Sequence, residues 1–196
     1  MKKYAWLIVA IVALIAISPA SAQSNKFKVY LAYNYVSPNG SESVSEDGVT
    51  ETLEAADEAG YSLGFEWRLG KWAGLEFDYL RSDHDIDLGG VTVAETTMNP
   101  LSASFNFHLV HTKVLDFYFG PTLSYVNWDD VETTDGETLS TDSEFGYGAQ
   151  VGLDISLIKS VAIVTGLRYT KLAISADGED VDVDPLFAKV GVAFRW

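Results

Sequence analysis

The chain has 196 residues, of which 47% are apolar and 21% are charged, and this composition excludes a largely disordered protein. Its formal net charge is −15 and it contains no cysteine, which excludes a basic nucleic-acid-binding surface, disulfides and thiolate metal sites. The 10 Tyr, 10 Phe, 5 Trp and 16 Gly, with only 5 Pro, favour β-strands over helices.

The N-terminal residues have the layout of a secretory signal peptide. Two lysines precede an apolar run over residues 5–17, and a small-x-small pattern follows at residues 20–22. A membrane anchor helix is the alternative, but the run is short for a hydrocarbon core about 30 Å thick. We therefore predict a cleaved signal peptide over residues 1–22 and an exported domain over residues 23–196.

Eight later segments alternate apolar residues with polar or small ones, which is the pattern of β-strands with two different faces. In the first segment, for example, Val29, Leu31 and Tyr33 alternate with Lys28 and Asn34. The eight segments are residues 27–35, 61–69, 73–79, 101–109, 117–125, 145–157, 161–169 and 186–196.

The connections between these segments distinguish a membrane barrel from a soluble β-sandwich, which would show the same alternation. Short connections, such as residues 70–72 and 158–160, alternate with long ones, such as residues 37–58, 83–95 and 129–142. This asymmetry is typical of outer-membrane barrels, which have short periplasmic turns and long external loops. We therefore predict an all-β fold, an eight-stranded antiparallel transmembrane β-barrel in a Gram-negative outer membrane, whose closure leaves no strand edge unpaired in lipid.

Aromatic residues are expected to form two bands on the barrel. Tyrosines 35, 61, 79, 125 and 169 fall near the long connections, and Trp67, Trp72, Phe117 and Trp196 fall near the short ones, as the two interfacial girdles require. Trp196 also ends the chain after apolar residues at alternate positions, which resembles the C-terminal signal of outer-membrane proteins. We therefore expect the barrel-assembly machinery as a partner, besides outer-membrane lipid and lipopolysaccharide.

Most of the 28 acidic residues fall in the long connections. Solvated, mutually repelling loops are the simplest interpretation. Bridging to lipopolysaccharide phosphates by divalent cations, or a surface receptor role, is the alternative. Asp129, Asp130 and residues 179–184 offer oxygen ligands for Ca²⁺, but their spacing does not match a dedicated calcium loop, so no metal site is predicted.

Several segments resemble the OmpW family. They include residues 28–38 (KVYLAYNYVSP), residues 118–125 (YFGPTLSY) and residues 145–154 (FGYGAQVGLD), and their order and spacing cover residues 26–196. Residues 98–100 (MNP) depart from that family's pattern. The resemblance implies a small barrel that binds small hydrophobic molecules from outside and releases them sideways through a gap in its wall, without chemistry or a cofactor.

The inward-facing positions predict two layers inside the barrel. An apolar cup is expected toward the external end, formed by Val36, Leu80, Met98, Val126 and Trp128. A charged floor is expected below it, formed by Glu66, Arg68, Glu76, Asp78, Asp154, Arg168, Lys189 and Arg195, with Lys28, His108 and Asp116 nearby. Because buried charges have to be paired, the floor would close the axial route, and a small hydrophobic solute in the cup would leave sideways. The alternative is that the apolar residues only pack the lumen.

Prolines mark candidate positions for such a sideways exit. Pro100 and Pro185 fall near the external ends of two strands, and proline cannot donate a hydrogen bond to the strand ladder. They indicate either a lateral opening in the wall or simple strand starts.

Two other functions are alternatives to transport. His84 lies beside Ser82, Asp83 and Asp85, a set that contains a nucleophile and a base. A histidine among solvated acids at a strand end is far more often inert, so no catalytic residue is predicted. A structural, adhesive or receptor barrel without transport is the stronger rival, because long acidic loops suit surface contacts.

Overall fold

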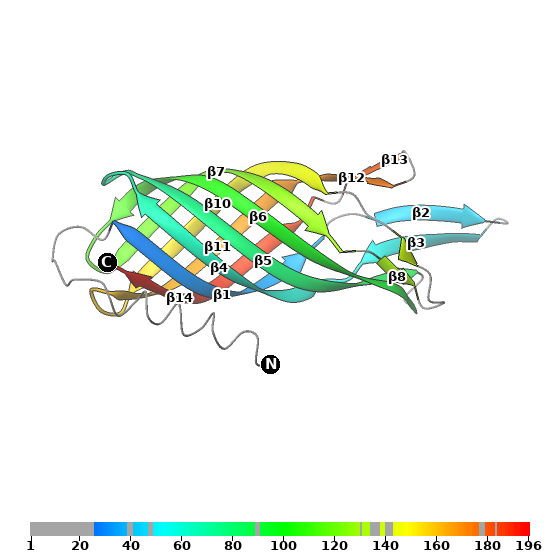
Figure 1. The fold of residues 1–196 in the computed structure, drawn as a ribbon, viewed down its shortest axis with the longest axis horizontal. Coiled ribbons are helices and arrows are strands. Elements are labelled where there is room, and N and C mark those ends of the chain that lie inside the picture. Colours follow the sequence, from blue (N-terminus) through cyan, green and yellow to red (C-terminus); the bar gives the residue numbers. More distant parts are fainter. Residues whose placement is uncertain are drawn as a thin grey trace.

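The fold is seen in a computed structural model of the chain (Figure 1). The structure describes residues 26–38, 41–46, 49–88, 91–129, 131–133, 138–139, 143–176, 179–182 and 184–196. The predicted signal peptide lies outside these described residues. Within them, no helix has the length and hydropathy needed to span a membrane.

The described strands include eight that close into one antiparallel barrel, which confirms the predicted fold class. Around the wall they follow the order β5, β4, β1, β14, β11, β10, β7 and β6, and β6 pairs again with β5 (Figure 1). These strands are β1 (Phe27–Ser37), β4 (Glu58–Arg68), β5 (Ala73–Leu88), β6 (Val91–His111), β7 (Leu115–Trp128), β10 (Glu144–Ser156), β11 (Val161–Lys171) and β14 (Leu186–Arg195). The first and last strands pair from Lys28 with Arg195 to Ser37 with Leu186, so the sheet has no open edge.

The long connections carry further strands at one end of the barrel, opposite the C-terminus (Figure 1). They are β2 (Ser41–Glu46), β3 (Val49–Ala55), β8 (Val131–Thr133), β9 (Thr138–Leu139), β12 (Ala173–Ala176) and β13 (Glu179–Asp182). Residues 83–95, expected as a loop, instead continue β5 and β6 as a paired ribbon apart from residues 89–90. Pairing within such ribbons satisfies backbone groups that a loop would leave to water.

The wall is apolar outside and polar inside, the reverse of a soluble sandwich. Leu31 is 59% exposed and Tyr61 is 73% exposed on the outer face, whereas Glu66 and Asp154 on the inner face are 0% exposed. The tyrosines expected in the external band, together with Trp67 and Trp72 near the short turns, are also exposed. The predicted direction of each strand's two faces is therefore confirmed.

Glycines on the inner face make room for two buried tyrosines. A Cβ atom added to Gly64 would lie 2.0 Å from Tyr30 Cζ, and one added to Gly152 would lie 2.2 Å from Tyr118 Cζ. Both tyrosines are 1% exposed. An eight-stranded barrel has an interior that side chains can just fill, and here each large ring occupies the space that a side chain at the glycine would take.

Candidate functional site

The apolar cup is a cluster of buried side chains at the end of the barrel that carries the long connections. All five predicted members belong to this one cluster, and Leu172 and Phe187 join them. Val36, Leu80 and Val126 are 0% exposed and Met98 is 1% exposed. We use "apolar cup" below for these residues: Val36, Leu80, Met98, Val126, Trp128, Leu172 and Phe187.

The charged floor lies below the cup, and one half of it is centred on Lys28. Its ammonium nitrogen lies 2.5 Å from Glu66 Oε2 and 3.1 Å from Asp154 Oδ2. Arg195 Nη2 donates to the same Asp154 oxygen at 2.7 Å. Arg68 Nε lies 2.8 Å from Glu66 Oε1, so each buried carboxylate faces two cationic groups. Such pairing offsets the cost of removing these charges from water.

The other half of the floor is centred on the hydroxyl of Tyr30. This oxygen lies 2.9 Å from Glu76 Oε1 and 2.9 Å from Asp78 Oδ2, and Lys189 Nζ donates to it at 2.8 Å. Lys189 Nζ also donates to Glu76 Oε1 at 2.9 Å. Arg168 Nη1 donates to Asp78 Oδ1 at 2.8 Å. The tyrosine therefore joins two ion pairs into one network.

His108 and Asp116 extend the network toward the short turns. His108 Nε2 lies 2.9 Å from Glu66 Oε1, and its Nδ1 lies 2.8 Å from Asp116 Oδ1. Arg68 contacts Asp116 as well. The floor thus crosses the lumen from strand to strand, with its acids and bases in equal number if His108 is neutral: Glu66, Glu76, Asp78, Asp116 and Asp154 against Lys28, Arg68, Arg168, Lys189 and Arg195.

The structure brings together every residue predicted for the cup and for the floor. Tyr30, Leu172 and Phe187 also belong to these two layers, although they were not predicted from the sequence. Their signal was parity: Tyr30 lies two residues from Lys28, and Phe187 lies two residues from Lys189, so each pair points to the same face of its strand. Most large apolar and aromatic residues of the strands point outward to lipid, so the few that point inward are hard to recognise from the sequence.

The hydrogen-bond ladder between two neighbouring strands is interrupted beside the cup. Between β5 and β6 the pairing runs to Tyr79 with Leu101 and resumes at Ser82 with Met98. The two pairs left out are Leu80 with Pro100 and Arg81 with Asn99. Pro100 is buried on the inner face, and it has no N–H to give to the ladder.

Pro185 differs from Pro100 in its setting. It precedes the first residue of β14, and its carbonyl oxygen accepts a hydrogen bond from the Thr170 amide at 3.1 Å. The backbone is thus tied across this position, as at an ordinary strand start.

Comparison with known proteins identifies the family. The model of the family described as outer membrane protein beta-barrel domain matches residues 7–195. The chain belongs to this family. It is an outer-membrane β-barrel of the Gram-negative type, and its outer wall faces lipid and lipopolysaccharide.

Solved structures show the same fold at low sequence identity. OprG from Pseudomonas aeruginosa has a TM-score of 0.69 and 17% identity, over 87% of this chain and 95% of that one. Neisserial surface protein A has a TM-score of 0.63 and 16% identity, over 87% and 97% of the chains. The E. coli outer membrane protein W has a TM-score of 0.57 and 16% identity, over 90% and 100%. Curated protein sequences yield no significant match, so membership of the OmpW family itself stays a prediction.

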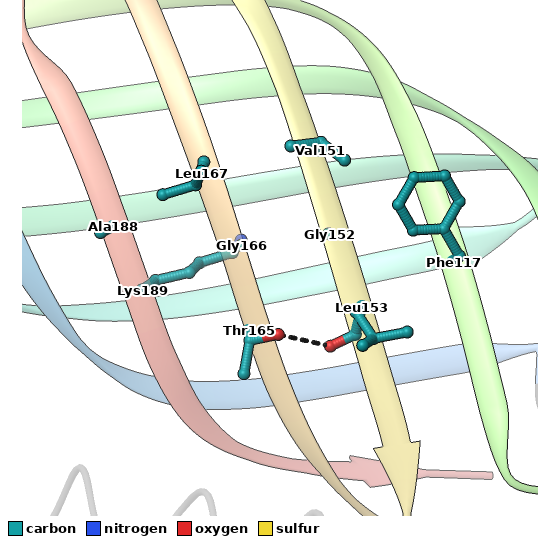
Figure 2. A pocket seen from close by; sticks show the side chains of 9 residues that line it. All are labelled: Phe117, Val151, Gly152, Leu153, Thr165, Gly166, Leu167, Ala188 and Lys189. Carbon is teal, nitrogen blue, oxygen red and sulfur yellow. Dashed lines mark hydrogen bonds between the residues drawn. The ribbon is translucent and has the colours of Figure 1, made fainter.

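The outer wall of this outer-membrane barrel carries a groove of about 330 Å³, shown in Figure 2. It crosses β7, β10, β11 and β14, and it is lined by Phe117, Val151, Gly152, Leu153, Thr165, Gly166, Leu167, Ala188 and Lys189. Gly152 and Gly166 are cross-strand partners, so the wall has no side chain from either position here. The groove overlies Lys189 of the floor rather than the cup, and it faces lipid.

The external end of this outer-membrane barrel holds the other candidate groups. Ser82 Oγ lies 2.9 Å from His84 Nε2, and His84 Nδ1 lies 3.2 Å from the Ala56 carbonyl oxygen. Both side chains are 2% exposed, and the contacts tie β5 to the chain just before β4. Among the described residues, no group of three or more His, Asp or Glu side chains could hold a metal ion. Asp130 lies outside the described residues.

The Asp184 carboxylate at this end is hydrogen-bonded to Tyr169, one of the tyrosines of the external band. Tyr169 donates its hydroxyl hydrogen to Asp184 Oδ2 at 2.6 Å, and the Leu172 amide donates to Oδ1 at 3.2 Å. The Tyr169 hydrogen bond lowers the pKa of Asp184 below its ordinary value. Asp184 also has a φ of 35°, a backbone region that Asp tolerates better than most residues. These contacts fix the chain just before β14 beside the cup.

Proposed function

We propose that this barrel assists small hydrophobic molecules across the outer membrane, by taking them into the apolar cup from outside and releasing them sideways into lipid. The observation that supports this most directly is the order of the two layers. An apolar solute in the cup lies above a floor of paired buried charges. To pass along the barrel axis it would have to separate these ion pairs and leave buried charges unpaired. The axial route is therefore the costly one.

The interruption between β5 and β6 supports the sideways route. Leu80 of the cup and Pro100 face each other across the two unpaired positions. A solute moving outward there has to displace side chains but breaks few backbone hydrogen bonds. The proposal assigns no catalytic step and no cofactor to the protein, and the Ser82–His84 contact is given a structural role.

The test is uptake by cells whose outer membrane contains the full-length protein, with an apolar probe and a polar probe of equal size. We expect a gain for the apolar probe alone. Trp128→Ala should reduce this gain several-fold while the amount of folded barrel stays unchanged. Trp72→Ala is the matched control, because Trp72 is 67% exposed in a short turn, and its uptake should equal that of the wild type.

Each other outcome points to a different function. An equal gain for both probes would indicate an aqueous pore and contradict a closed floor. No gain for either probe would favour the structural, adhesive or receptor role of the external strands.

A further inference from the structure

The junction between the cup and the floor lies on one strand. Arg168 and Thr170 of β11, and Leu172 directly after the strand, point inward at every second position of its external end. Leu172 belongs to the cup and Arg168 to the floor, so that Thr170 lies between an apolar side chain and a guanidinium. Thr170 is 1% exposed and Arg168 is 5% exposed. Phe187 on the next strand closes the junction, with its ring centroid 4.5 Å from Arg168 Cζ.

Polar atoms at this junction lack a partner. Within the described part of the chain, Thr170 Oγ1 and Arg168 Nε are buried and form no hydrogen bond. Trp128 Nε1, among the apolar side chains of the cup, is also buried without a partner. Buried polar groups are normally satisfied, and an exception calls for an explanation such as an absent ligand or water.

We infer that the molecules taken by the cup are neutral hydrophobic compounds with one oxygen acceptor, such as an alcohol, a ketone or an ester. This inference rests on the function proposed above and narrows its substrate class. The oxygen lies at Thr170 and Arg168, and the hydrocarbon part lies against Leu172 and Phe187. Guanidinium and indole N–H groups only donate hydrogen bonds, so a pure hydrocarbon leaves them unsatisfied.

The charges around the junction select a neutral acceptor over a carboxylate. Arg168 is already paired with Asp78 at 2.8 Å, and the acids and bases of the floor match in number. A second carboxylate would therefore stand beside Asp78 without a cation of its own. The net charge of −15 also repels anions that approach from outside.

The test compares three probes of equal chain length: octane, 2-octanone and octanoate. The initial uptake rate is measured for cells that carry the full-length barrel, after subtraction of the rate for cells without it. We expect the wild type to take up 2-octanone about tenfold faster than octane. A site that hydrogen-bonds a polar group of its substrate rejects an analogue that lacks this group. Thr170→Val keeps the shape of the side chain but removes its hydroxyl, so the preference for 2-octanone over octane should be mostly lost.

Thr165→Val is the matched control, since it makes the same substitution on the lipid-facing side of β11. Thr165 Oγ1 donates to the Leu153 carbonyl oxygen at 3.0 Å, as Figure 2 shows, and the wild-type preference should persist. Trp128→Phe removes the third donor, and we expect it to weaken the preference as well. If Thr170→Val does not fold, the inference is still tested by the ratio of 2-octanone to octane uptake in the wild type and by the change of that ratio in Trp128→Phe.

The outcomes separate this inference from the proposed function. Equal uptake of octane and 2-octanone by the wild type, or a preference for octanoate, overturns the inference and leaves transport through the cup standing. An unchanged preference in folded Thr170→Val also overturns it. Uptake of none of the three probes overturns the proposed function and the inference together.

Discussion

The guanidinium of Arg168 lies over the ring of Phe187, with 4.5 Å between Cζ and the ring centroid. The two residues are register partners on β11 and β14. One face of the guanidinium contacts an aromatic ring, and its Nη1 atom donates to Asp78 at 2.8 Å. A guanidinium is weakly hydrated and stacks on aromatic rings, so this residue can border an apolar layer and a charged one at once.

Arg168→Met should destabilise the barrel. It leaves the buried Asp78 carboxylate with a hydrogen bond from Tyr30 but without its cationic partner, and an uncompensated buried charge costs about 3–5 kcal/mol. The free energy of unfolding, measured with urea in detergent micelles, should fall by that order. The double variant Arg168→Met/Asp78→Asn should recover most of the loss. Equal losses in the single and double variants would contradict the pairing.

Gly64→Ala should also destabilise the barrel, because the added methyl group meets the Tyr30 ring. Overpacking a filled interior costs about 1–3 kcal/mol. Gly70→Ala is the control, since a Cβ there has no atom within 4 Å, and its free energy of unfolding should stay within about 0.5 kcal/mol of the wild type. If the two variants unfold alike, Tyr30 does not occupy the space beside Gly64.

Pro100→Val should close the interrupted part of the β5–β6 ladder, because valine supplies an N–H and favours strands. The amide introduced at position 100 should be protected from hydrogen exchange by its place in the ladder, and uptake of an apolar probe should fall if the exit lies there.

Pro121→Val is the matched control for this change. Between β6 and β7 the pairing likewise skips Phe105 with Pro121 and Asn106 with Gly120, but Pro121 is exposed on the outer face. Its replacement should leave uptake unchanged. An uptake loss in Pro121→Val as large as that in Pro100→Val would mean that the exit is not specific to Pro100.

Asp184 should contribute a pH-dependent part of the stability. Its pKa is lowered in the folded state by the Tyr169 hydroxyl, so its contribution is fully present above the ordinary carboxyl pKa of about 4. The contribution is lost as the pH falls through the lowered pKa. Asp184 is only half-buried, and solvent screening keeps the effect small.

Asp184→Asn isolates this contribution, because asparagine accepts the Tyr169 hydrogen bond, tolerates a positive φ and carries no charge. The difference in unfolding free energy between the wild type and this variant should be largest at neutral pH and should shrink below about pH 4. A difference that does not change with pH would show that the charge of Asp184 contributes nothing.

The face of each side chain could be predicted from the sequence because it is a local property. Successive residues of a strand point to opposite sides, so that once Leu31 is assigned to lipid, Lys28, Asn34 and Tyr30 must face inward. The same rule placed Glu66 and Asp154 in the lumen and Val126 and Trp128 above them. Connection lengths then indicated which end of the barrel is external.

The partners of each inward side chain were decided only by the tertiary structure. Lys28 and Asp154 are 126 residues apart in sequence, and they meet because the register and tilt of the closed sheet bring their strands together across the lumen. The same closure sets Tyr30 against Gly64 and adds Leu172 and Phe187 to the cup, and it leaves Thr170 Oγ1 at the junction without a partner among the residues that the structure describes. Alternation specifies which way a side chain points, but the stagger of the whole barrel determines what it contacts.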